Sequence, residues 1–233
     1  MKKIAVVGSS GFVGKALFDI SKELDISIIS ITKENFSKYS SESFDVLIHA
    51  AMPSGKYWAK INPFEDFTRT VGLTAELIYN WNYEKFVLIS TISAKNYLIG
   101  HPYAIHKRLS EILASSKNSL IVRLGTLYGN NMKKGPLYDL LNNKQLFVDL
   151  QSQYNFIDVE FCAKWIFNNL DKKGIIELGA SDTLSLLDIA KKLQLDPHYT
   201  GEVEIISTEK IEKDMPNTNE IWEFLTKYTK LTQ

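Results

Sequence analysis

The sequence lacks the features that mark several large classes of protein. Its 233 residues include one cysteine and four histidines, so neither a disulfide framework nor a zinc cluster fits the composition, and we predict no metal site. The 27 basic and 27 acidic residues cancel to zero net charge, which provides no overall field to attract nucleic acid or an anionic membrane. Any phosphate site must therefore be local.

Long apolar runs are missing as well. No apolar stretch approaches the about 20 residues that a membrane-spanning helix needs. The run after Lys2 and Lys3 stops at Gly8, before the core of a signal peptide could form. With hydrophobic residues at 45% and charged residues at 23%, the composition predicts a globular chain, and the single Cys162 fits the reducing cytoplasm.

Short apolar runs rich in β-branched residues alternate with longer segments of helical periodicity. Runs that are apolar on both faces are typical of a parallel sheet covered by helices, so we predict an α/β fold with a doubly wound parallel sheet. The connection 32–44 is too short for a further strand with its helix, and one sheet edge should therefore end a strand early. Its serine-rich part, 37–43, is predicted to be an exposed turn. The expected strands cover 4–7, 26–31, 46–49, 86–89, 120–122 and 175–178.

A glycine-rich turn directly follows the first predicted strand. Gly8 permits a tight turn, Gly11 lets the backbone approach a pyrophosphate, and Gly14 lets the next helix pack against the strand. The N-terminus of that helix supplies backbone N–H donors. Strand, turn and helix together predict a dinucleotide site, whose loop contains Gly8, Ser10, Gly11, Phe12, Val13 and Gly14.

The end of the second predicted strand bears on which dinucleotide binds. A carboxylate there would hold the 2′-hydroxyl of the adenosine ribose, whereas hydroxyls and a cation suit a 2′-phosphate. Ser30, Thr32 and Lys33 stand at this position, and the first acidic residue is Glu34. The sequence therefore favours NADP(H) and leaves NAD(H) open, since Lys33 also fits an ordinary solvated surface residue.

A tyrosine and a lysine stand one helical turn apart at positions 103 and 107. The ammonium of Lys107 can stabilise the phenolate of Tyr103 and so lower the pKa of the phenol, which prepares the pair for proton transfer. Ser90 and Thr91 follow the predicted strand 86–89, at the edge of a parallel sheet where ligands bind. A hydroxyl there can hydrogen-bond a substrate oxygen opposite the phenol.

Five motifs, in order along the chain, resemble those of the extended short-chain dehydrogenase/reductase family, in its nucleotide-sugar epimerase and dehydratase branch. The motifs lie at 7–14, 45–51, 88–91, 103–107 and 122–129, and the segments 156–163 and 177–180 extend the match. The resemblance covers most of the chain, and five ordered motifs are much more specific than any single one.

The resemblance implies a role for each matching residue. Tyr103 would transfer a proton, Lys107 would lower the pKa of Tyr103 and bind a ribose, and Thr91 would orient the substrate. Tyr103 and Lys107 would both also contact the cofactor. Further contacts are expected with the cofactor from Ala50, Ala51, Met52, Leu124 and Gly125, and with the substrate from Ser90, Ser93 and Thr126.

The sequence pattern after Gly129 and the resemblance together divide the chain, and the resemblance implies its assembly. Residues 1–126, completed by about 156–180, would form a dinucleotide-binding Rossmann core. Residues 127–155 and 181–233 would form a small, reduced C-terminal substrate lobe, with a helix at 136–141 and short strands at 146–148 and 203–207. The helix that carries Tyr103 would mediate a homodimer.

The sequence departs from the family pattern at three places. Ile92 and Ser93 stand where the dehydratases have an Asp-Glu pair, which argues against 4,6-dehydration. Thr70 replaces a frequent asparagine of the proton relay, and Tyr154 lies near the position of the arginine that grips the diphosphate of a nucleotide sugar. The last two changes bear on proton relay and on the substrate class.

We therefore expect an NAD(P)-dependent oxidoreductase of carbohydrate biosynthesis that reduces the C4 keto group of a nucleotide-linked deoxysugar. The same residues also suit a nucleotide-sugar 4-epimerase with retained NAD. A protein of another class, a non-catalytic redox sensor that binds NADP(H), would keep the dinucleotide site and has no need of Tyr103 and Lys107.

Overall fold

The computed structural model describes residues 2–231, which divide into two compact units. The first unit contains the described chain up to Arg123 together with Glu160–Ile176, and the second contains Leu124–Val159 and the described chain from Glu177. These bounds lie a few residues from the predicted ones. Within the described residues, no helix has the length and apolar character needed to cross a membrane.

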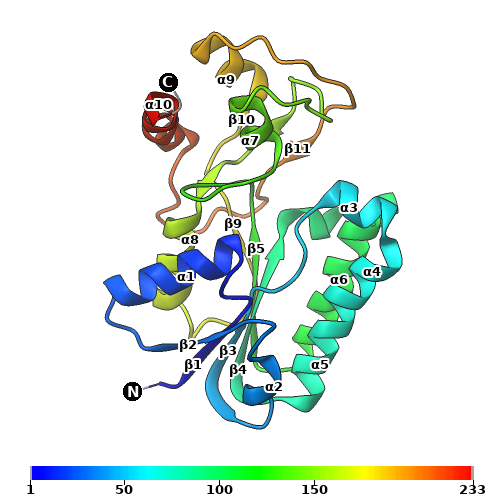
Figure 1. Ribbon diagram of the computed structural model, residues 1–233, viewed down its shortest axis with the longest axis vertical. Helices are drawn as coiled ribbons and strands as arrows, with labels where there is room; N and C mark the ends of the chain where they lie inside the picture. Colours follow the sequence, from blue (N-terminus) through cyan, green and yellow to red (C-terminus); the bar gives the residue numbers. More distant parts are fainter. Residues whose placement is uncertain (1, 232–233) are drawn as a thin grey trace. The chain divides into compact units, whose positions relative to one another are not determined.

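A six-stranded parallel sheet forms the centre of the fold, which confirms the predicted α/β class (Figure 1). Its strand order is β2-β1-β3-β4-β5-β9. In the register, Ile4 pairs with Ile28 on one side and with Val46 on the other. The strands are β1 Ile4–Val7, β2 Ile28–Ile31, β3 Ser43–His49, β4 Asn82–Thr91, β5 Ser119–Leu124 and β9 Gly174–Leu178.

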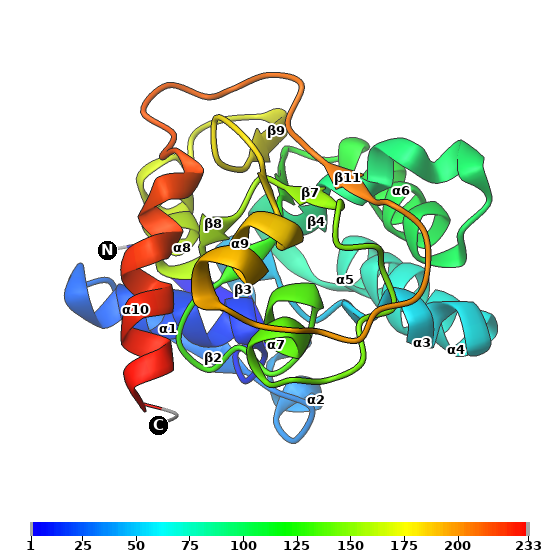
Figure 2. The same ribbon diagram turned by 90° about the horizontal axis from the view of Figure 1, so that it is seen from above.

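Helices cover both faces of this sheet. Figures 1 and 2 show α1 (Phe12–Glu23) and α8 (Val159–Asn168) on one side. The other side carries α3 Lys56–Ile61, α4 Pro63–Phe67, the π-helical turn η1 Thr68–Gly72, α5 Leu73–Asn80 and α6 Pro102–Ser115. Alternate strand residues, including Val7, Leu47 and Leu88, pack with Leu77 and Ile78 of α5 in one buried cluster. Side chains two positions apart in a strand point to the same face of the sheet, so one layer of helices packs against them.

One side of the sheet ends at β2, which is the edge strand. As predicted, the short connection from β2 to β3 adds no strand beyond it. The prediction of an exposed turn over 37–43 is wrong in part. A short helix, α2 (Phe36–Tyr39), lies there, and β3 already begins at Ser43. The ring of Phe36 packs against Trp81 with ring centres 4.8 Å apart, so contacts with a distant tryptophan order the start of a polar segment.

The second unit is built from short elements. Strand β6 (Leu127–Tyr128) pairs with β8 (Ile157–Asp158), and a small sheet has the order β10-β7-β11. The side chain of Asn155 lies against Gly125 and Gly179, where an added Cβ would collide with it. The remaining elements are β7 Gln153–Tyr154, β10 Leu184–Ser185, β11 Ile205–Ile206, α7 Pro136–Leu141, α9 Leu186–Leu193, η3 Thr218–Glu220 and α10 Ile221–Leu231.

The predicted elements of the second unit were only partly correct. Helix 136–141 is present as α7, whereas the strand predicted at 203–207 shrinks to the two residues of β11. The strand predicted at 146–148 is reduced to a single bridge between Leu146 and Tyr199. Short β-segments depend on a partner elsewhere in the chain, so a local apolar pattern overstates their length.

Candidate functional site

The glycine turn brings the end of β1 against the segment that follows β3. Gly8 has a φ of +88°, and a Cβ on it would lie 2.6 Å from the Cα of Ala51. A Cβ on Gly14 would overlap the backbone of Gly8, so the start of α1 packs closely on the turn that follows β1. Gly11 is exposed, and no side chain of the described residues caps the N-terminus of α1 there. The turn therefore leaves backbone N–H groups directed at a position that an anion can reach.

The residues predicted to line the cofactor after β3 lie directly beside this turn. The backbone N–H of Ala50 donates to the carbonyl of Val7 at 2.9 Å, which continues the pairing of β1 with β3. Ala51 packs on Gly8, and Met52 is half-buried. The structure thus joins two predicted parts of the dinucleotide site that lie more than a whole βαβ unit apart in sequence.

The end of β2 is ordered by an asparagine that sequence reasoning did not single out. Asn35 accepts from the backbone N–H of Thr32 at 2.7 Å and donates to the carbonyl of Ser30 at 3.0 Å. The Thr32 side chain, the backbone N–H of Glu34 and the charge of Lys33 lower the pKa of the exposed Glu34 carboxyl. Lys33 is exposed. The predicted residues Ser30, Thr32 and Lys33 therefore form one turn.

The two hydroxyls at the end of β4 have different partners. Ser90 is buried and donates to the carboxylate of Glu111 at 2.7 Å. Thr91 is half-buried, and its Oγ1 accepts from the backbone N–H of Ser93 at the start of η2 (Ile92–Ile99) at 3.3 Å. Because Thr91 uses an acceptor position in this contact, its own O–H remains to donate to a ligand. Ser93 is itself buried.

Tyr103 and Lys107 lie together on the first two turns of α6. Both side chains are buried, and the ammonium of Lys107 is 5.3 Å from the ring centre of Tyr103. Pro102 begins the helix, and Nδ1 of His101 accepts from the N–H of Tyr103 at 3.2 Å. This capping interaction fixes the backbone of the tyrosine at the helix start. The helical spacing predicted from the sequence is present, and the two groups are close enough for charge and phenol to interact.

Glu111 extends the face of α6 that carries Tyr103 and Lys107, and sequence reasoning missed it. It lies one turn beyond Lys107 and is completely buried. Its carboxylate accepts from Arg123 at 2.8 and 2.7 Å, from Arg108 at 3.0 Å and from Ser90. The repeat of polar residues at 103, 107 and 111 was the signal that could have revealed it.

Three predicted site residues, Leu124, Gly125 and Thr126, belong to the second unit. There the N–H of Gly125 donates to the carbonyl of Leu178 at 2.7 Å, and the carbonyl of Thr126 accepts from Ile157 at 3.0 Å. Tyr154, also in this unit, is buried and its hydroxyl donates to Glu204 at 3.0 Å. Burial and the charge of Glu204 raise the pKa of the Tyr154 phenol, so it stays neutral. A tyrosine at this position has no positive charge to offer a diphosphate.

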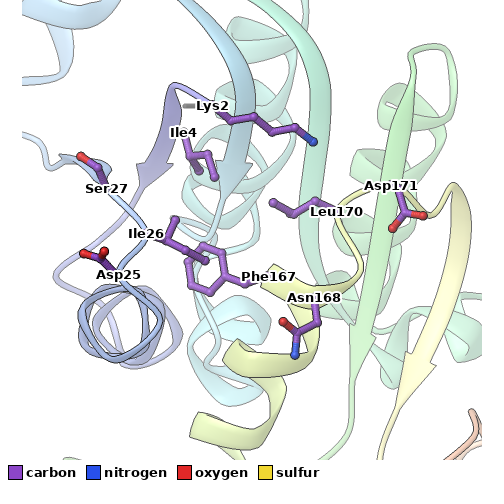
Figure 3. Close-up of a pocket in the computed structure, with 9 residues that line it drawn as sticks. All are labelled: Lys2, Ile4, Asp25, Ile26, Ser27, Phe167, Asn168, Leu170 and Asp171. Atoms are coloured by element: carbon purple, nitrogen blue, oxygen red, sulfur yellow. The ribbon is translucent and has the colours of Figure 1, made fainter.

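The first unit also contains a cavity of about 330 Å³ at the opposite end of the sheet. Figure 3 shows Phe167 and Ile26 pointing toward each other in it, with Lys2 and Asp171 at its border. It lies beside Ile4, the first residue of β1, whereas the predicted ligand residues follow the last residues of the strands. None of the predicted site residues lines this cavity.

The residues at the carboxyl ends of β1 and β3 fit a dinucleotide. An added Cβ at Gly8 would meet the backbone of Ala51, and one at Gly14 would meet the backbone of Gly8, so the glycines keep this turn compact. The exposed Gly11 at the start of α1 leaves the N–H groups accessible to a pyrophosphate. Within the described residues, no group of three histidine, cysteine or acidic side chains suits a metal ion.

No family model and no curated protein sequence matches the chain. Solved structures do. MoeE5 in complex with UDP-glucose and NAD is 14% identical, with a TM-score of 0.83 over 99% of both chains. A UDP-N-acetylglucosamine 4-epimerase from Methanobrevibacter ruminantium M1 is 15% identical, with a TM-score of 0.78 over 98% of this chain and 97% of its own.

RMD from Pseudomonas aeruginosa, complexed with NADPH, is 15% identical, with a TM-score of 0.75 over 98% of this chain and 100% of its own. The chain therefore has the fold of these proteins over nearly its whole length. At these identities the likeness shows the fold that the resemblance to the extended short-chain dehydrogenase/reductase family implied.

Proposed function

We propose that the protein is an NAD(P)-dependent oxidoreductase that reduces the 4-keto group of a nucleotide-linked deoxysugar. The observation that carries the proposal is the pairing of Tyr103 with Lys107, 5.3 Å from ring centre to ammonium, in a fold shared with a protein that binds UDP-glucose and with a nucleotide-sugar epimerase. A nicotinamide nucleotide bound at the glycine turn would supply the hydride. The chain itself supplies the proton and the orientation of the substrate.

The proton comes from Tyr103. Its phenol donates to the carbonyl oxygen as that oxygen gains negative charge, and the nearby ammonium of Lys107 stabilises the phenolate that remains. Thr91 donates a second hydrogen bond to the same oxygen, because its Oγ1 accepts from Ser93 and its O–H is left for the ligand. Two donors held in place before the reaction stabilise the developing alkoxide. Ser90 is less suited to this role since its hydroxyl donates to Glu111.

For the cofactor we retain the preference for NADP(H). The turn at the end of β2 offers the Thr32 hydroxyl and the Lys33 ammonium, which suit a 2′-phosphate. The exposed Glu34 carboxylate in the same turn favours NAD(H). Because this turn carries one exposed cation and one exposed carboxylate, the Kd values of NADPH and NADH are to be compared directly.

A second candidate is a nucleotide-sugar 4-epimerase with retained NAD. It is favoured by the epimerase fold at a TM-score of 0.78, and it uses the same tyrosine and lysine. Tyr154 in place of a diphosphate-binding arginine leaves the nucleotide moiety without that contact in both candidates.

The experiment follows absorbance of the reduced nicotinamide. Steady consumption of NADPH or NADH with a nucleotide-linked 4-keto-6-deoxysugar supports the reductase. Conversion of UDP-glucose or UDP-N-acetylglucosamine to its 4-epimer without net change in absorbance supports the epimerase. Binding of NADPH with no turnover of any of these substrates supports the redox sensor and contradicts both enzymes.

We also propose a homodimer that forms through α6 and its neighbours in the first unit. Large apolar side chains are exposed on this helical layer, and Phe64 is 82% exposed. The others are Tyr57, Ile61, Phe67, Leu109 and Ile112. Exposed apolar side chains gathered on one helical layer favour a protein–protein contact there. We retain the cytoplasm as the location predicted from the single cysteine.

The oligomeric state is tested by light scattering on Phe64→Asp. The dimer proposal predicts a monomeric mass for this variant and a dimeric mass for the unaltered chain. Phe147→Asp is the matched control, because Phe147 is 71% exposed but lies in the second unit. A monomeric unaltered chain, or an equal effect of the two substitutions, contradicts the proposed interface.

A further inference from the structure

His49 occupies a fully buried position at the end of β3, next to the segment that follows the strand. Its Nδ1 accepts a hydrogen bond from the backbone N–H of Ala51 at 3.4 Å, and its Nε2 lies 3.2 Å from Oγ1 of Thr74. Because Nδ1 acts as an acceptor, the ring proton resides on Nε2, which donates to Thr74. The two contacts fix both the tautomer and the orientation of the ring.

Thr74 anchors this ring to the helical layer. The hydroxyl of Thr74, on α5, donates to the carbonyl of Thr70 in η1 at 2.7 Å. Its Oγ1 also lies 3.2 Å from Oγ of Ser110 on α6. The side chains of His49, Thr74 and Ser110 are buried, and so is Thr70, whose carbonyl accepts from Thr74, so these hydrogen bonds are shielded from water. Thr74 and its helical neighbours therefore hold the ring of His49, and no ligand is needed to orient it.

Through Nδ1, the ring of His49 contacts the segment Ala50–Met52, which lies between His49 and the glycine turn. The backbone of Ala51 leaves no space for a Cβ on Gly8, and Ala50 donates to Val7 at 2.9 Å. Since the glycine turn packs on one side of Ala51 and His49 binds its N–H, a shift of this segment changes the space beside the turn.

We propose that His49 is a positioning residue for the dinucleotide, which fixes the segment Ala50–Met52 against the glycine turn through the N–H of Ala51. The inference rests on the proposed function, because that function assigns this segment to the cofactor. His49 has no contact with the ligand in this role and acts through the backbone of Ala51.

The charge state of the ring supports the role. Complete burial, together with the nearby positive charge of Lys107, lowers the pKa of His49 to about 3. The imidazole therefore stays neutral near pH 7, and Nδ1 keeps its lone pair for Ala51.

The test uses two amides that each reproduce one half of the imidazole. In His49→Asn, the side-chain oxygen occupies the place of Nδ1 and can accept from Ala51. In His49→Gln, the amide reaches the place of Nε2 and Thr74 but leaves the Ala51 N–H without its acceptor. Binding of NADH and NADPH is measured by the change in nucleotide fluorescence, which needs no substrate, and melting temperatures are recorded alongside.

The proposal predicts that His49→Gln raises the Kd of the bound nucleotide about tenfold, whereas His49→Asn stays within about threefold of the unaltered protein. A merely structural role predicts that each variant, having lost one buried hydrogen bond, binds the nucleotide equally well. Equal Kd values for the two variants overturn the inference alone. Failure of the unaltered protein to bind either nucleotide overturns the proposed function and the inference with it.

If neither amide variant folds, Thr74 carries the test. Thr74→Val removes the hydroxyl that lies 3.2 Å from Nε2 of His49 and 3.9 Å from Sδ of Met52, whereas Thr74→Ser retains it. A Kd several-fold higher in Thr74→Val than in Thr74→Ser supports the proposal, and equal values overturn it.

Discussion

The carboxylate of Glu111 and the guanidinium of Arg123 form a two-pronged ion pair, with N–O distances of 2.8 and 2.7 Å. Glu111 is completely buried, and its first oxygen also accepts from Ser90. The pair therefore links α6, β4 and β5 beneath the residues proposed to act on the substrate. Its geometry explains why Ser90 and Thr91, adjacent in sequence, have different capacities to bind a ligand.

Glu111→Gln should lower the free energy of unfolding by about 3–5 kcal/mol, because it removes the negative charge opposite a buried guanidinium. Urea unfolding measures the loss. The control is Glu23→Gln, which breaks the exposed ion pair with Lys164 at 3.1 Å and should cost at most about 1 kcal/mol. A similar small loss for both variants would contradict the importance of the buried pair.

Gly8→Ala should be much more damaging than Gly100→Ala. Both glycines have a left-handed backbone, with φ of +88° and +83°. A Cβ on Gly8 meets the backbone of Ala51, whereas a Cβ on Gly100 meets nothing within 4 Å. Gly100→Ala should therefore cost about 1 kcal/mol from backbone strain, and Gly8→Ala a further 1–3 kcal/mol or so from overpacking. Chemical unfolding of the two variants measures the difference, and equal losses would show that the turn can relax.

Tyr103→Phe should lower kcat about 10²–10⁴-fold, because it removes the phenolic proton and keeps the ring. The Kd for the nicotinamide nucleotide should change little by comparison. The readout is steady-state turnover of the substrate that the unaltered enzyme reduces or epimerises, with nucleotide binding measured separately. The exposed Tyr57→Phe is the control and should leave kcat unchanged. An unchanged kcat in Tyr103→Phe rejects the proton-donor role.

Lys33→Ala should weaken NADPH binding about fivefold to tenfold and leave NADH binding nearly unchanged, because only the 2′-phosphate carries the charge that the lysine attracts. Titration with each nucleotide at one ionic strength measures the ratio of the two Kd values. Lys38→Ala, a change to an exposed lysine on α2, is the control. Equal increases in the Kd values of NADPH and NADH would show that Lys33 does not contact the 2′-phosphate.

Protonation of His49 makes acid conditions destabilising. The pKa is about 3 in the folded chain and 6.5 for an unperturbed histidine, so the unfolded chain binds the proton first as the pH falls. Above pH 6.5 this histidine does not lower the free energy of unfolding. Below pH 6.5 the free energy of unfolding falls by about 1.4 kcal/mol per pH unit towards pH 3. Unfolding measured between pH 7 and 4.5 should show a smaller slope in His49→Asn, and parallel curves would contradict a neutral buried imidazole.

The central sheet was predictable because each strand carries its own signal. The run 4–7 coincides with β1, and the short connection after β2 correctly placed that strand at the edge. The small elements of the second unit were less predictable. Each has two residues that pair, and the bridge from Leu146 to Tyr199 depends on a residue far along the chain.

The sequence by itself determined the features that depend on the spacing of residues close together in the chain. Three glycines after a buried run specify a strand, a tight turn and a helix, and positions 103 and 107 fall on one face of any helix that contains them. These features depend on residues close together in the chain, so their geometry follows from backbone periodicity alone. The roles assigned to these residues in binding and proton transfer stay predictions.

Only the tertiary structure decided how these parts are supported. That Ser90 binds Glu111 while Thr91 keeps its O–H, and that His49 joins Ala51 to Thr74, depends on which strands and helices are neighbours. A buried polar group must find its partner wherever the fold provides one. Such partners come from segments far apart in the sequence, and no local pattern of residues encodes their choice.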